Sequence, residues 1–189
     1  MKKIVLAAII AASVAACSTN PPLNFSVPNI GVSAKKIDAE LKSLTVSLAR
    51  PDEAKGKIPA QAQHEVPQMW QNALTEALNK MAIFRDDAPR KLSLSVKILA
   101  IDIPSFGASM TTTTIARYEL IDRADGSIIY TQDVSADGEV PFNYAFAGVI
   151  RARESVSRSA QNNIAQFLQA LETVDVSKPM FPNRQESTP

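Results

Sequence analysis

The sequence predicts a single α+β domain in which an antiparallel-dominated sheet carries two amphipathic helices on one face. Alternating apolar residues, typical of half-buried strands, recur in four segments, and two longer segments have apolar residues three and four positions apart. The elements follow in the order β-α-β-β-β-α. Packing both helices on one face of the sheet buries the apolar sides of all elements together. With 189 residues, the chain has room for one such domain.

The first elements are a strand and a helix. Leu44, Val46 and Leu48 alternate with small polar residues and predict a strand. A Pro-rich loop follows through about residue 64 and holds the single histidine, His64. A helix is predicted next, and Pro67 suits its first turn. Its apolar face, interpreted as core, consists of Val66, Met69, Trp70, Ala73, Leu74, Ala77, Leu78 and Met81.

Three further strands and a closing helix complete the domain. Alternation from Leu92 to Ile98 changes parity before Ile101, which predicts a bulge near Leu99-Ala100. Residues 109–140 predict a long hairpin that turns at Asp125-Gly126. The last helix is predicted over 147–172, and its apolar side consists of Val149, Ile150, Val156, Ala160, Ile164, Phe167, Leu168 and Leu171.

The N-terminus has the pattern of an export signal. Lys2 and Lys3 precede a mainly apolar run that ends at Ala16, too short to span a bilayer. The run Val14-Ala15-Ala16-Cys17 resembles the bacterial lipobox, with Val14 where Leu is usual. The resemblance implies removal of residues 1–16 and acylation of Cys17, with palmitate-type chains as a stable anchor. An ordinary secretory signal with a chance cysteine is the alternative.

Charge and cysteine usage limit the partners of the mature chain. Loss of Lys2 and Lys3 leaves 18 of the 20 basic residues against 19 acidic ones, so no bulk field favours nucleic acid. Cys17 is the only cysteine, so the fold has no intrachain disulfide. Ser18 follows Cys17 where an Asp would imply inner-membrane retention. The resemblance therefore implies, in a Gram-negative host, an outer-membrane lipoprotein that faces the periplasm.

The predicted organisation has four parts. Residues 1–16 are a signal peptide, residues 17–40 the lipidated Cys17 and a Pro-rich tether, residues 41–174 the domain, and residues 175–189 a disordered tail. Within the tether, four apolar residues are more than a free linker needs: Phe25, Val27, Ile30 and Val32. Either part of the tether lies along the domain, which we favour, or it binds a partner.

No pattern typical of catalysis is present. A metal site needs several His, Cys or clustered carboxylates, and no Gly-rich phosphate loop or nucleophile elbow occurs. Asp86 and Asp87 are interpreted as a solvated turn and not as an acid/base pair. Thr111 to Thr114 are interpreted as exposed strand residues that could present hydroxyls at a sheet edge. We therefore expect no enzyme, no cofactor and no metal.

The best candidate for a partner surface lies before and within the last helix. Three aromatic residues, Phe142, Tyr144 and Phe146, precede Arg151 and Arg158, which share a helix face. Aromatic and Arg side chains are favoured anchors in protein interfaces. A solvated helix face with local ion pairs is the alternative and is favoured over an anionic-ligand site.

Over residues 40–172, the chain resembles the ABC-type transport auxiliary lipoproteins. The resemblance rests on Trp70 to Leu78 in a helix, Leu92 to Val96 in a strand, the Asp125-Gly126 hairpin and a closing helix. The tyrosine-led opening strand that such proteins often have is not found. The resemblance implies a non-enzymatic accessory protein of an envelope transport or lipid-trafficking complex that binds protein partners. The alternatives are a module of another envelope machine, for cell-wall synthesis, secretion or surface-appendage assembly, or an enzyme.

Overall fold

A computed structural model of the chain describes residues 21–181. The predicted signal peptide, Cys17 and Ser18 lie outside the described residues, as do residues 182–189. The predicted order of elements is confirmed. The elements are β1 (Glu40–Leu48), α2 (Ala62–Met81), β2 (Lys91–Asp102), β3 (Met110–Asp122), β4 (Ile128–Val140), the short 3-10 helix η1 (Phe142–Tyr144) and α3 (Gly148–Leu171).

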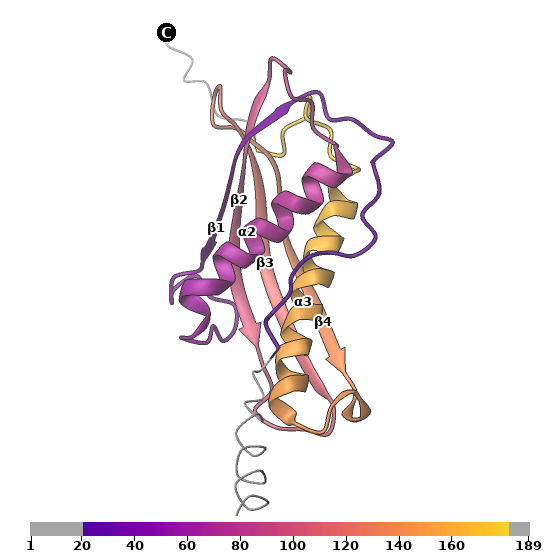
Figure 1. Ribbon diagram of the computed structural model, residues 1–189. Coiled ribbons are helices and arrows are strands. Elements are labelled where there is room, and N and C mark those ends of the chain that lie inside the picture. Colours follow the sequence, from indigo (N-terminus) through magenta and orange to yellow (C-terminus); the bar gives the residue numbers. More distant parts are fainter. Residues whose placement is uncertain (1–20, 182–189) are drawn as a thin grey trace, which may run out of the picture.

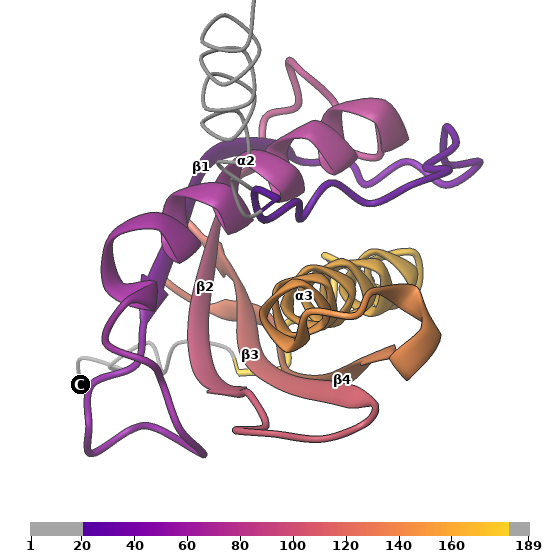
Figure 2. The same cartoon turned by 60° about the horizontal axis from the view of Figure 1, so that its bottom comes forward.

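The four strands form one mixed sheet in the order β1-β2-β3-β4. Strand β1 pairs parallel to β2, with α2 as the crossover between them, and β2, β3 and β4 pair antiparallel. Both helices lie on one face, α2 over β1 and β2 and α3 over β3 and β4 (Figures 1 and 2). The predicted bulge is confirmed by a register shift between Ile98 and Ala100. Gly126 takes a positive φ of 75° in the predicted hairpin turn.

The core lies between the sheet and the helices. Its largest side chains are Trp70 of α2, Tyr118 of β3 and Phe167 of α3, which are completely buried. The rings of Tyr118 and Phe167 stack with centroids 4.1 Å apart. Alternation in β3 places Ala116, Tyr118 and Leu120 in this core, as the sequence predicts.

The segment before β1 packs against both helices. The Asn24 backbone N–H donates to Ser157 Oγ of α3 at 3.1 Å, and Ser26 Oγ donates to Glu76 of α2 at 2.9 Å. Between them, Phe25 is 2% exposed and meets the edge of Trp70, with ring centroids 5.9 Å apart. Figure 1 shows this indigo segment passing between the helices. Part of the segment that the sequence assigns to the tether therefore lies along the domain, as favoured above, and belongs to its core.

The end of the described chain also differs from the predicted disordered tail. Phe181 and Ile128 exchange backbone hydrogen bonds of 3.0 and 2.9 Å, so residues 180–181 pair with the start of β4. An edge strand offers unpaired N–H and C=O groups, which explains why this polar, Pro-containing segment is held. Helix α2 begins at Ala62, so His64 lies exposed in its first turn and not in the preceding loop.

A row of small polar side chains joins α3 to β3. Thr112 and Thr114 are buried, although the sequence predicts exposed strand residues there. The Thr112 and Ser155 hydroxyls lie 2.7 Å apart, and the Ser159 hydroxyl lies 2.9 Å from that of Thr114. Ser155, Ser159 and Asn163 lie four residues apart on α3 and therefore share one face. Hydrogen bonding offsets the desolvation of these groups, so the helix packs close to the sheet through polar contacts.

Asn163 connects this row to the aromatic core. Its side-chain amide N–H groups donate to the Thr114 and Val134 carbonyls at 3.1 and 2.9 Å, and its oxygen accepts from the Tyr118 hydroxyl at 2.9 Å. The Tyr118 oxygen in turn accepts from Trp70 Nε1 at 3.2 Å. Burial raises the pKa of Tyr118 far above its ordinary value, so the phenol stays protonated and donates to Asn163.

The face of the sheet without helices is polar and is joined by ion pairs. Asp133 of β4 accepts two bonds from the Arg117 guanidinium of β3, at 2.6 and 3.0 Å, and also pairs with Lys55. The hydrogen bonds from Arg117, and then those from Lys55, hold the pKa of Asp133 below its usual range. The same pair raises the pKa of Arg117.

Replacing Asn163 with Ala should strongly destabilise the domain. The substitution leaves the Tyr118 hydroxyl proton without its acceptor and removes the side-chain donor from two buried carbonyls, and we expect a loss of about 3 kcal/mol in the free energy of unfolding. Urea denaturation followed by circular dichroism measures it. The matched control is Asn162→Ala, because this neighbour is exposed and makes a single bond to the Asp137 carbonyl. Equal losses in the two variants would contradict the role of the buried network.

The pair of Asp133 and Arg117 should make stability depend on acid pH. Because the folded-state pKa of Asp133 is lowered, its contribution is present above the ordinary Asp pKa of about 3.9 and is lost as pH falls through the folded value. We expect Asp133→Asn to reduce the free energy of unfolding at neutral pH and to become equal to the wild type in strong acid. In an Arg117→Gln background, the same substitution should have a much smaller effect. A wild-type-to-variant difference that is constant with pH would refute this prediction.

Candidate partner surfaces

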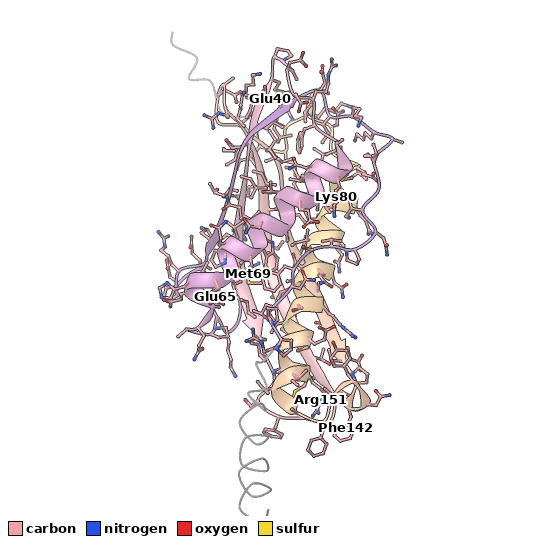
Figure 3. All side chains as sticks on the ribbon, in the orientation of Figure 1. Glu40, Glu65, Met69, Lys80, Phe142 and Arg151 are labelled. Atoms are coloured by element: carbon pink, nitrogen blue, oxygen red, sulfur yellow. The ribbon has the colours of Figure 1, made fainter. Side chains whose placement is uncertain are left out.

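The predicted aromatic residues gather at one end of the molecule. Phe142, Tyr144 and Phe146 lie between β4 and α3 and are 55%, 48% and 95% exposed. Figure 3 labels Phe142 and Arg151 at this end and Glu40 at the opposite one. Large apolar groups that gather on a surface mark contacts with a protein or a membrane.

Sequence reasoning missed two members of this surface. Phe106, in the loop between β2 and β3, is 88% exposed, and Val149 in the first turn of α3 is 51% exposed. We call Phe106, Phe142, Tyr144, Phe146 and Val149 together the aromatic tip. Phe106 is an isolated aromatic in the turn before β3, and no local pattern connects it with residues some 40 positions later.

Arg151 holds the two loops of the aromatic tip together. Its guanidinium donates to the carbonyls of Ala145 and Phe146 at 2.6 and 2.8 Å, and to that of Gly107 at 3.2 Å. It also lies 5.0 Å from the centre of the Phe142 ring. Arg151 is 5% exposed, so it is not available as an anchor for a partner or an anionic ligand, contrary to the sequence prediction.

Arg158 is likewise occupied by contacts within the chain. It forms the local ion pair with Glu154 at 2.8 Å, and Nη1 donates to the Glu139 carbonyl at 3.0 Å. Its guanidinium lies 5.2 Å from the centre of the Tyr144 ring. The two predicted Arg residues therefore position the aromatic residues instead of extending from the surface beside them.

A second candidate surface is a cleft of about 520 Å³ between β1 and the second half of α2. Its apolar floor includes Leu41 and Leu44 of β1 and Leu78 of α2. Its rim carries Glu40, Lys42, Arg85 and Asp86, a balanced set of charges. Asp86 therefore stands beside a cleft, although no metal-binding group of three or more His, Cys or carboxylate residues occurs within residues 21–181.

Three of the four rim charges form ion pairs with each other or with neighbouring residues. Glu40 is 2.5 Å from Lys42 and also pairs with Lys91, and Arg85 pairs with Asp38 at 3.1 Å. Hydrogen bonds from Lys42 and then Lys91 lower the pKa of Glu40, so this carboxylate is ionised at neutral pH. A partner in the cleft therefore meets neutralised pairs and no excess of one charge.

The cleft runs beside a free strand edge. In the described part of the chain, β1 has one neighbouring strand, β2. The Ala49 N–H donates to Ile98 of β2 at 2.8 Å, and N–H groups alternate in direction along a strand. The N–H groups of Leu44, Val46 and Leu48 therefore point away from β2, and their half-buried side chains share one face. This edge can accept an additional strand.

The predicted membrane attachment concerns residues outside the described range. Cys17, the predicted lipidation site, is among them. In residues 21–181, no helix is long and apolar enough to span a membrane.

No protein-family model and no curated protein match the chain. Among solved structures, the hypothetical protein CT253 from Chlamydia trachomatis is similar with a TM-score of 0.51 and 11% identity, over 75% of this chain and 98% of its own. Protein XCC0632 from Xanthomonas campestris, described by the family model DUF330, has a TM-score of 0.49 and 11% identity, over 80% and 95%.

A putative lipoprotein from Caulobacter crescentus has a TM-score of 0.38 and 16% identity, over 69% of this chain and 88% of its own. At such identities, similarity concerns the fold alone, and the Chlamydia protein shares it with this chain. The resemblance to the ABC-type transport auxiliary lipoproteins stays a prediction.

Proposed function

We propose that this chain is a lipoprotein of the outer membrane, anchored through Cys17, that faces the periplasm and serves an envelope transport or lipid-trafficking complex without catalysing a reaction. The export signal and the run Val14-Ala15-Ala16-Cys17 support the location. Ser18 supports the outer membrane. Acylation at one cysteine gives a domain of this size a fixed place near its partners.

The observation that carries the binding role is the free edge of β1 with the cleft beside it. We infer that an extended segment of a partner protein adds to β1 and places alternate side chains in the cleft. Backbone groups of Leu44, Val46 and Leu48 would supply the hydrogen bonds, and the apolar floor would supply side-chain selectivity. The paired rim charges favour a segment without strong net charge.

A module of another envelope machine remains the alternative. The same edge would serve cell-wall synthesis, secretion or appendage assembly equally well, because strand addition reads backbone geometry first. The identity of the bound protein therefore separates the two functions.

Replacing Cys17 with Ser should abolish the anchor. The wild-type protein should fractionate with the outer membrane and have the mass of a chain that begins at an acylated Cys17. The variant should lack the acyl mass and either keep its signal peptide or leave the membrane fraction. Circular dichroism should match that of the wild type, because Cys17 precedes the packed chain. An unchanged mass and fractionation would refute the lipoprotein assignment.

A photo-crosslinking residue in place of Lys42 should capture the partner in cells, and one in place of Gln68 should not. Lys42 lines the cleft, whereas Gln68 is exposed on α2 outside it. We expect a subunit of an envelope transporter in the product at position 42. Val46→Pro should reduce the yield, because it removes an outward N–H while leaving the bonds to β2. Leu44→Lys, which places a charge on the cleft floor, should do the same.

Three results would contradict this proposal. Equal capture at both positions would exclude the cleft. Capture that persists in both Val46→Pro and Leu44→Lys would exclude strand addition. A captured protein of cell-wall synthesis or appendage assembly would replace the transport role with the alternative.

A further inference from the structure

The aromatic tip has no charged residue in its two loops. Residues 103–109 and 141–149 contain none, although 21% of the chain is charged. Phe106 and Phe146 are almost fully exposed, and Phe142, Tyr144 and Val149 are about half exposed. A soluble surface rarely gathers so many apolar groups on loops that carry no charged residue. The composition fits the interfacial zone of a bilayer, where aromatic side chains are enriched.

Three backbone carbonyls of the tip accept hydrogen bonds from one buried side chain. The guanidinium of Arg151 engages the carbonyls of Ala145, Phe146 and Gly107 from inside the molecule. Unpaired carbonyls oppose entry into an apolar medium, so this arrangement lowers the free-energy cost of moving the loops out of water. The charge of Arg151 itself stays on the protein side, beneath the Phe142 ring.

The described chain begins beside this tip. Arg153 Nε donates to the Pro21 carbonyl at 2.7 Å. Arg153 lies six residues after Ala147, the cap of α3, so Pro21 is displaced from the tip by about 9 Å along the helix. Cys17 lies four residues before Pro21, and four residues span at most about 14 Å. A membrane that holds Cys17 is therefore within reach of the tip.

The end of the domain near Phe181 cannot contact the membrane in place of the tip while the domain stands upright. Strand β4 has 13 residues and extends from the Phe181 end to the tip, about 43 Å at the usual rise per residue. A four-residue connection from Pro21 cannot place the far end against the bilayer that holds Cys17 unless the domain lies flat. The packed segment from Pro21 to Phe25 prevents the domain from moving away on a longer tether.

We propose that the aromatic tip inserts into the lipid surface that carries the acyl chains of Cys17. The domain is then held upright, with its long axis pointing away from the membrane and its Phe181 end remote from the lipid. This inference rests on the proposed lipidation of Cys17. It assigns the tip to phospholipid, and leaves the β1 edge along the side of the domain open to a protein partner. The chain thus has two membrane contacts: the anchor holds it at the membrane, and the tip sets its orientation.

Tryptophan reporters in the complete mature lipoprotein test the inference. The natural Trp70 is completely buried and gives a constant background. Phe146→Trp places an indole at the tip, and Phe181→Trp places one at the far end as the matched control. Each protein is reconstituted into vesicles of phosphatidylethanolamine with a smaller share of phosphatidylglycerol, with or without brominated acyl chains as quenchers.

We expect the added emission of Phe146→Trp to shift to the blue and to lose most of its intensity in brominated vesicles. The added emission of Phe181→Trp should keep its aqueous maximum and its intensity. Adding Phe106→Asp to the Phe146→Trp protein should restore most of the lost intensity, because a charge now opposes insertion. Thermal unfolding of every variant verifies that the fold is retained.

The outcomes separate this inference from the proposed function. A chain without the acyl mass that does not float with the vesicles would overturn lipidation itself. An acylated, floating chain whose tip and control indoles are quenched equally would overturn the inserted tip alone. An unquenched indole in Phe146→Trp would do so as well, and would return the aromatic tip to the role of a protein-binding surface.

Discussion

The structure depends on the close approach of α3 to β3 and β4. A Cβ atom on Gly138 of β4 would lie 2.2 Å from the Ser155 carbonyl oxygen, so a side chain cannot fit there. Hydroxyls and one amide, from Thr112, Thr114, Ser155, Ser159 and Asn163, make the close contact by bonding across it. Apolar side chains of ordinary size would separate the two layers. This contact fixes the helix whose first turn carries Arg151, and hence positions the aromatic tip.

The segment before β1 fixes the direction in which the N-terminal part of the chain approaches the domain, so the proposed anchor at Cys17 would give an oriented attachment. A free Pro-rich linker would let the domain rotate, since a flexible chain fixes only a distance. Here Phe25 is buried against Trp70, and Asn24 bonds to α3, so the chain enters the fold in one direction. The same aromatic core that holds the two helices therefore also sets the position of the segment from Asn24 to Ser26.

The surfaces of the domain divide into three kinds. The open face of the sheet is polar and joined by ion pairs such as Arg117 with Asp133. The tip is uncharged and aromatic, and the β1 edge combines a cleft with outward backbone groups. These differences support a division of roles in which one end meets lipid and one side meets protein, and neither role needs a reactive group.

Local patterns in the sequence determined the helices, the strands, the turn at Gly126 and the bulge near Ala100, because each depends on neighbouring residues. The export signal with Cys17 is a prediction from the same kind of local pattern. Only the tertiary structure decided the parallel pairing of β1, the burial of Thr112 and Thr114, and the inward direction of Arg151. It also placed Phe106 in the aromatic tip, together with residues that follow some 40 positions later in the sequence. These features arise from contacts between distant segments, which hydrophobic periodicity does not encode.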